Sequence, residues 1–181
     1  PLRLVGSEMC IRDSYYLLLS SLLGALVVSS SRDMLTLFIG IELASAPMFL
    51  LSGWKKGDPK SNEGAIKFFL LGVLSASLIL YGFSLLYGLT GELIFSEISK
   101  VLLVTNLATS PAALLSVMLI LAGIGFKISV VPFHSWAPDT YEGAPLPVTA
   151  YLSVSSKATG FVALMIILTK VFPDSGSSWG I

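Results

Sequence analysis

The feature that most constrains this chain is the recurrence of long apolar segments, each long enough to cross a bilayer as a helix. About 20 apolar residues in a helix span a hydrocarbon core of about 30 Å. Of the 181 residues, 54% are hydrophobic and 12% are charged, which lies outside the range of soluble globular domains. We therefore expect an all-α membrane protein with about five transmembrane helices, because lipid does not tolerate open sheet edges.

The apolar segments predict both the spans and one break. The predicted spans cover residues 15–29, 34–54, 63–89, 111–141 and 148–172. We expect the fourth span to be broken near residues 129–132, because Pro132 lacks a backbone donor and clashes with the preceding turn. In the less apolar stretch 91–106, apolar residues at helical spacing lie opposite Glu97 and Lys100, which predicts a short interfacial helix. The apolar face of that helix is formed by Ile94, Phe95, Ile98, Val101 and Leu102.

The two ends of the sequence differ from this helical body, which covers residues 15–172. Residues 1–14 resemble the in-frame translation of a transposase-type sequencing adapter, and we interpret them as an artefact of library preparation. The alternative is a genuine N-terminal peptide with a short charged region. On the adapter interpretation, the single cysteine, Cys10, says nothing about redox compartment or metals. Residues 173–181 are polar, and we expect the natural chain to continue beyond both ends.

The charges predict an orientation in the membrane. Lys55, Lys56 and Lys60 follow the second predicted span, whereas the preceding connection carries only Arg32 as a basic residue. Cytoplasmic loops carry an excess of lysine and arginine. The 55–60 loop is therefore predicted to face the cytoplasm.

Several chemistries have no counterpart in the sequence. The formal net charge is zero, so no basic field favours nucleic acid. Gly123-Ile124-Gly125 follows no strand, and we interpret it as a site of close helix packing rather than a dinucleotide fingerprint. One histidine without a native cysteine excludes the usual metal sites. No iron–sulfur spacing, haem motif or Ser-His-Asp set is present, so any redox chemistry belongs to other chains.

Three ionisable residues lie deep in the predicted spans: Glu42, Lys127 and Lys157. Each costs about 2.5–3.5 kcal/mol at the bilayer centre unless it meets a partner, protein interior or water. Burial disfavours the charged form of a lysine and a nearby carboxylate favours it, so a lysine with a movable carboxylate partner is a switchable proton site. We therefore predict that these three residues lie on a proton path.

Each candidate also has a structural alternative. Glu42 could hold two helices together as a counter-charge, and Lys127 could satisfy carbonyls freed by the break. Lys157 lies too deep to reach the headgroups easily. Lys67 lies one turn inside its helix, where it either joins the path or pairs with a carboxylate one turn earlier. His134, just after the break, is either a proton relay or a hydrogen-bonded packing residue.

One long motif carries a family resemblance. The stretch GIGFKISVVPFHSWAPD at residues 123–139, continued by TYEGAP and by Ser-Lys-Ala at 156–158, resembles the proton-translocating membrane subunits of respiratory complex I. The form Asp-x-Tyr-x-Gly-Ala-Pro is most similar to the subunit N family of the bacterial NADH–quinone oxidoreductase. The related L and M subunits tend to have Asp-Ala-His here. Gly40-Ile41-Glu42-Leu43 also resembles the family's helix with the key glutamate.

The resemblance implies a fold and assigns the candidate residues to it. The family fold has two inverted five-helix repeats, each with a broken helix, and the predicted spans resemble the first repeat, family helices 4 to 8. By this resemblance Glu42 is the helix-5 glutamate, Lys67 the helix-6 lysine, Lys127 the lysine of the broken helix and Lys157 the central helix-8 lysine. His134 matches the histidine after the break. Nothing matches the second repeat, so we expect a truncated chain.

The implied function is proton translocation coupled to quinone reduction, in a membrane subunit without a redox centre. NADH, FMN, iron–sulfur clusters and quinone are expected in other subunits. The expected partners are lipid and membrane subunits resembling K and M, and the expected location is the bacterial inner (plasma) membrane. The alternative is a subunit of a multisubunit sodium/proton antiporter. A purely structural membrane subunit is disfavoured by the three deep charges.

Overall fold

The computed structural model describes residues 2–55 and 57–172, with side chains from residue 12 onward. The predicted tail at 173–181 and the side chain of Cys10 lie outside this description. The regular elements in the described residues are helices. In addition, Asp33 and Ile94 form an isolated antiparallel bridge. They are α1 (Leu2–Ser30), α2 (Met34–Ser52), α3 (Pro59–Thr90), α4 (Phe95–Val104), η1 (Leu107–Thr109), α5 (Pro111–Ile128), α6 (Trp136–Gly143), α7 (Leu146–Tyr151), η2 (Leu152–Ser156), α8 (Lys157–Ile166) and η3 (Ile167–Val171).

The all-α membrane fold class with about five spans is confirmed. Five described segments are long and apolar enough to cross a membrane, the last being the continuous run from α7 to η3. α3 begins at Pro59 rather than at residue 63, because Asp58 accepts a hydrogen bond from the backbone of Lys60 and Pro59 suits the first helical position. α1 begins at Leu2 rather than at residue 15. The adapter interpretation of residues 1–14 stays a prediction.

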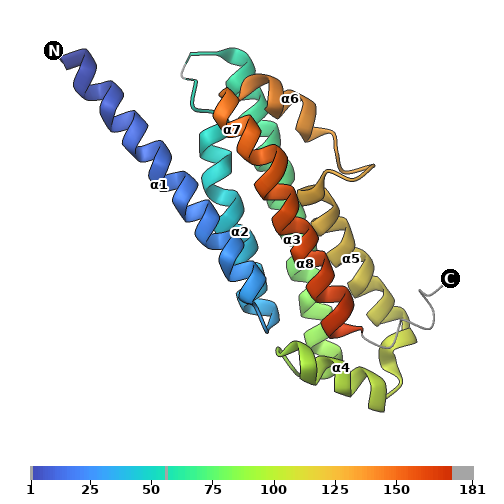
Figure 1. Ribbon diagram of the computed structural model, residues 1–181. Helices are drawn as coiled ribbons and strands as arrows, with labels where there is room; N and C mark the ends of the chain where they lie inside the picture. Colours follow the sequence, from blue (N-terminus) through green and yellow to red (C-terminus); the bar gives the residue numbers. More distant parts are fainter. Residues whose placement is uncertain (1, 56, 173–181) are drawn as a thin grey trace.

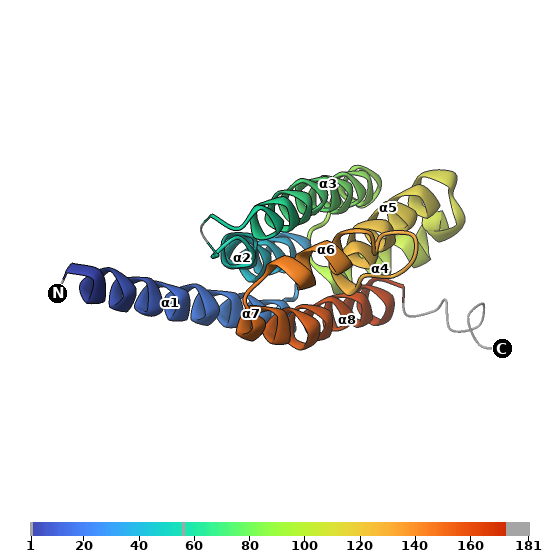
Figure 2. The same ribbon diagram turned by 90° about the horizontal axis from the view of Figure 1, so that it is seen from above.

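The helices are arranged around α3 and α5 (Figure 1). α1 packs along α2, α3 along α5, and α8 against α5 and α1. α4 lies across one end of this bundle, and α6 lies at the opposite end beside the start of α3. Seen from above, the N-terminal half of α1 extends beyond the other helices (Figure 2).

Small residues bring α3 and α5 into close contact. A Cβ atom on Gly123 would lie 2.7 Å from the carbonyl oxygen of Ser75, and one on Gly82 would lie 2.8 Å from that of Ser116. The hydroxyl of Ser75 donates to the carbonyl of Gly123 at 2.8 Å. The interpretation of Gly123 as a close-packing residue is therefore confirmed.

α4 is the predicted short helix, and its apolar face contacts protein. Phe95, Ile98 and Leu102 are buried in the same core as Ile167 and Val171 of the last span. Ile94 was predicted on this face but is exposed. The reason is that Ile94 precedes the helix with extended backbone and bridges to Asp33, which turns its side chain outward.

A second apolar cluster lies at the end of the bundle where α6 packs. Trp136 is fully buried and stacks on Phe68, with ring centroids 4.4 Å apart, and it also contacts Phe126. These rings join α6 to α3 and α5. They fix the position of the segment that follows the break.

Candidate functional site

The predicted break lies where the proline placed it. α5 ends at Ile128, and Ser129 adopts a left-handed conformation with φ of 62°. The backbone of Val130 donates to the carbonyl of Gly125 at 2.9 Å, which closes the helix end. α6 does not begin until Trp136. The prediction of one broken helix is confirmed.

The carbonyls freed at this break receive donors from other elements. The indole nitrogen of Trp136 donates to the carbonyl of Phe126 at 3.1 Å. In a continuous helix, the carbonyl of Ile128 would accept from residue 132, which is a proline without an N–H group. The amine of Lys157 takes that place, with its Nζ 3.3 Å from the Ile128 oxygen. The lysine that satisfies a freed carbonyl is thus Lys157, not Lys127.

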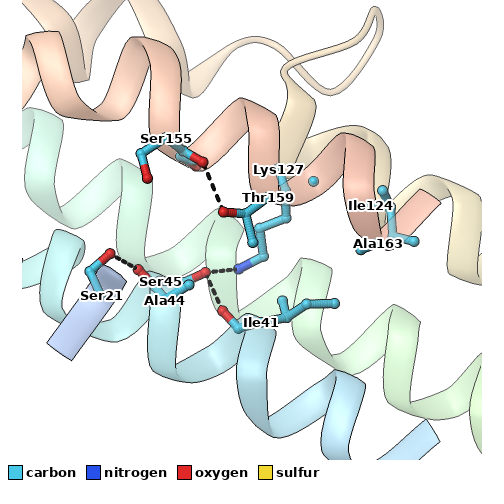
Figure 3. A pocket seen from close by; sticks show the side chains of 11 residues that line it. Ser21, Ile41, Ala44, Ser45, Ile124, Lys127, Ser155, Thr159 and Ala163 are labelled. Carbon is cyan, nitrogen blue, oxygen red and sulfur yellow. Dashed lines mark hydrogen bonds between the residues drawn. The ribbon is translucent and has the colours of Figure 1, made fainter. Parts of the chain in front are cut away.

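Lys127 lies in the last turn of α5, and its side chain is 8% exposed. Its amine donates to the hydroxyl oxygen of Ser45 in α2 at 2.8 Å (Figure 3). The Nζ atom lies 3.6 Å from Oε1 of Glu42. That oxygen is buried without a hydrogen-bond partner, whereas the Glu42 side chain as a whole is 31% exposed. The rings of Phe49 and Phe126 lie 5.7 and 5.8 Å from the amine, within the range of cation–π attraction.

Lys157 lies on the neighbouring span, directly after the π-helical segment η2. Its side chain is half-buried, and its amine lies 5.9 Å from the ring centre of Tyr141 as well as on the carbonyl of Ile128. Since Ile128 directly follows Lys127 in the chain, both lysines lie at the C-terminal end of α5. The structure therefore brings Glu42, Lys127 and Lys157 to one region, around the break.

Lys67 lies elsewhere, at the junction of α3 and α6. Its amine is 2.6 Å from Glu63, one turn earlier, and 2.6 Å from Asp139 in α6. The spacing in the sequence predicts a carboxylate one turn earlier, whereas the approach of Asp139 depends on how α6 folds back onto α3. Lys67 therefore makes the ion pair with a carboxylate one turn earlier that was the structural alternative to a place on the proton path.

His134 is not brought to the lysines. It lies in the connection between α5 and α6, and its side chain is exposed. Within the described part of the chain, no hydrogen bond or ion pair joins His134 to Lys127 or Lys157. Its backbone carbonyl accepts from Ala137 at 3.0 Å, so the residue contributes to the turn that starts α6.

A small pocket lies beside Lys127, with several hydroxyl groups in an otherwise apolar lining, and the sequence did not predict it. Figure 3 shows it between α2, α5 and the last span. It has about 20 Å³ of room for the centre of a water molecule, enough for at least one water. The signal in the sequence was the small polar residues at helical spacing around Lys157. The polar side chains of the lining are Ser21, Ser45, Lys127, Ser155, Ser156 and Thr159.

A transmembrane bundle with a carboxylate and an ammonium beside a broken helix is of the kind found in ion-translocating membrane proteins. Over residues 31–179 the chain matches the family described as NADH:quinone oxidoreductase/Mrp antiporter, TM. The chain belongs to this family.

Individual relatives agree with the resemblance to subunit N. The chain is 46% identical over 164 residues to NAD(P)H-quinone oxidoreductase subunit 2 of Trichormus variabilis, covering 90% of this chain and 32% of that protein. It is 45% identical over 168 residues to NADH-quinone oxidoreductase subunit N of Heliobacterium modesticaldum, covering 92% and 34%. A chain of respiratory complex I from Thermus thermophilus matches with a TM-score of 0.73 and 37% identity, over 84% of this chain and 33% of that one. The chain thus spans about a third of the length of these relatives.

Proposed function

We propose that the protein containing this chain is a membrane subunit of an NADH–quinone oxidoreductase that takes part in proton translocation coupled to quinone reduction. The observation that carries the proposal is the pair Glu42–Lys127, 3.6 Å apart beside a broken membrane helix. The names of the relatives supply the electron-transfer context.

The geometry supports a stepwise transfer. A carboxylate near Lys127 favours the ammonium, and withdrawal of Glu42 would make the buried amine release its proton. Lys157 is the next amine along the break, held at the carbonyl of Ile128. The two amines bind different acceptors, so transfer between them runs through water or through a change of rotamer. His134 and Lys67 would act before or after the transfer from Lys127 to Lys157, and not in that transfer itself.

The wider assignments are part of the same proposal. This chain contributes no redox centre, and NADH, FMN, iron–sulfur clusters and quinone belong to other subunits. The protein acts as a non-redox subunit of a translocase, next to membrane subunits resembling K and M, in a bacterial plasma membrane. The first inverted repeat lies in this chain, and a second repeat is expected in the remaining two thirds of the protein.

The test measures proton uptake per electron in membrane vesicles that contain the assembled complex. Glu42→Ala, Lys127→Met and Lys157→Met are expected to bring uptake close to background, because each removes a group that holds or controls the proton. Glu42→Asp keeps the charge and is expected to remain near the wild-type value. Wild-type uptake in both Glu42→Ala and Lys157→Met would show that these charges are structural.

The alternative function, a subunit of a sodium/proton antiporter, differs from the proposed one in what drives proton uptake. In a quinone-linked translocase, uptake requires electron transfer and is unchanged when potassium replaces sodium. Uptake that needs a sodium gradient and ignores quinone reduction would favour the antiporter. The family description covers both kinds of protein.

A further inference from the structure

Ser45 is the residue that Lys127 actually binds. It lies on the same face of α2 as Glu42, one turn further along. Its hydroxyl donates to the carbonyl of Ile41 at 2.7 Å and accepts from the Lys127 amine at 2.8 Å. A serine hydroxyl has one proton and two acceptor positions. Because the Ser45 proton is donated to the carbonyl of Ile41, the Ser45 oxygen is left to accept from the Lys127 amine (Figure 3).

Glu42 is the stronger acceptor but is not the one used. The distance from Nζ to Oε1 is 3.6 Å, beyond a normal hydrogen bond, and Oε1 is buried without a hydrogen-bond partner. A charge-assisted bond to a carboxylate is about twice as strong as a neutral one. An amine free to move would therefore close onto Glu42. The ammonium has three donors, so the bond to Ser45 leaves two of them free. What that bond fixes is the position of Nζ, from which Oε1 of Glu42 is 3.6 Å away.

We infer that Ser45 is a positioning residue for Lys127. The Ser45 hydroxyl keeps the Lys127 amine beside the pocket and prevents a closed ion pair between that amine and Glu42. This inference rests on the proposed function. The pocket contains Ser45, Lys127, Ser155 and Thr159 in its lining and has room for at least one water, and a water there would be a proton acceptor beside the amine. An amine closed onto Glu42 would retain its proton.

The first experiment compares serine variants in the assembled complex. Ser45→Ala is expected to lower proton uptake per electron toward the value of Lys127→Met, because the amine loses the hydrogen bond that positions it. Ser45→Thr is expected to restore uptake, because threonine keeps the hydroxyl and the same bond to the preceding turn. Ser77→Ala is the matched control, since Ser77 makes the same kind of bond, to Val73 at 2.9 Å, on an exposed face. Its uptake should equal that of the wild type.

The second experiment separates positioning from a merely structural role. In Ser45→Ala/Glu42→Asp the shortened carboxylate cannot reach the amine, so uptake should recover above that of Ser45→Ala alone. A structural defect at Ser45 would not be repaired by shortening Glu42, and absence of recovery would overturn the inference. If Ser45→Ala does not assemble, Ser45→Cys keeps the volume with a weaker acceptor. Partial loss of uptake in Ser45→Cys supports the inference, and wild-type uptake overturns it.

Lys127→Met, measured in parallel, distinguishes the role of Ser45 from the proposed function. Loss of uptake in Lys127→Met together with wild-type uptake in Ser45→Ala would overturn the role of Ser45 and leave the proposed function intact. Wild-type uptake in Lys127→Met would overturn both.

Discussion

Two lysines that lie deep in the predicted spans, Lys127 and Lys157, have different partners in the folded chain. Lys127 turns toward α2, where the hydroxyl of Ser45 and the carboxylate of Glu42 lie. Lys157 binds the carbonyl that Pro132 deprives of its helical donor. In the described part of the chain no carboxylate pairs with Lys157, so a backbone dipole and an aromatic ring surround its amine. Pro132 removes the backbone donor for the Ile128 carbonyl, and Lys157 supplies a donor in its place.

This pairing predicts a cost in stability for Lys157→Met. The carbonyl of Ile128 would lose its donor, and an unpaired buried acceptor costs about 1–3 kcal/mol. Thermal unfolding of the detergent-solubilised protein should show the loss as a lower midpoint. Lys170→Met, at the exposed end of the same span, should change the midpoint little. Equal midpoints for the two variants would mean that the Ile128 carbonyl has no need of the lysine.

At the scale of elements, the break lets α6 leave the direction of α5 and pack against α3. A Cβ atom on Gly64 of α3 would lie 2.7 Å from the carbonyl oxygen of Asp139 in α6, so the two backbones touch there. The buried hydroxyl of Thr140 lies 2.8 Å from the carbonyl of Trp136 in its own helix and 3.2 Å from the carbonyl of Gly64, and its single proton is shared between these two acceptors. Ion pairs between Lys67 and Asp139 and between Lys60 and Glu142 surround this contact. Because those charged side chains are substantially exposed, packing rather than charge is expected to hold α6.

Two glycines of α3 test this view. Gly64→Ala would force the added methyl into the backbone of α6 and is expected to destabilise the protein by about 1–3 kcal/mol. Gly88→Ala, in the same helix with no atom within 4 Å of the added Cβ, should be neutral or stabilising by up to about 1 kcal/mol. Denaturation midpoints in the same detergent give the comparison. A harmless Gly64→Ala would contradict the close contact of α3 and α6.

At the scale of the whole molecule, the two ends of the bundle have different characters. The end where α3 begins carries Lys55, Lys60 and the ion pairs to α6. The other end carries the connection to α4, which packs by its apolar face. Charged residues also lie at the α4 end, which has the ion pair between Lys100 and Glu97. The orientation predicted from the lysines stays a prediction.

Cysteine labelling in intact cells tests this orientation. Lys55→Cys and Glu92→Cys each place a thiol on an exposed residue, beyond opposite ends of α3. If the 55–60 loop is cytoplasmic, Lys55→Cys requires a membrane-permeant reagent, whereas Glu92→Cys reacts with an impermeant one. The opposite pattern would reverse the topology.

The sequence by itself determined the features that depend on neighbouring residues. Apolar length predicted the spans, Pro132 predicted the end of α5, and the long motif around Lys127 placed the chain in its family. These are local properties, because hydrophobic length and a missing backbone donor act wherever the helix is placed. They sufficed to single out Glu42, Lys127 and Lys157.

Only the tertiary structure decided which groups those residues meet. Ser45 and Asp139 carry no mark in the sequence that joins them to Lys127 and Lys67, since each contact crosses between helices. The exposure of His134 likewise follows from the path of the chain after the break. Helix packing sets such contacts through the close approach of small residues and the direction of each side chain, which hydropathy alone does not contain. The position of the Lys127 amine, short of Glu42 and bound to Ser45, was therefore decided by the fold.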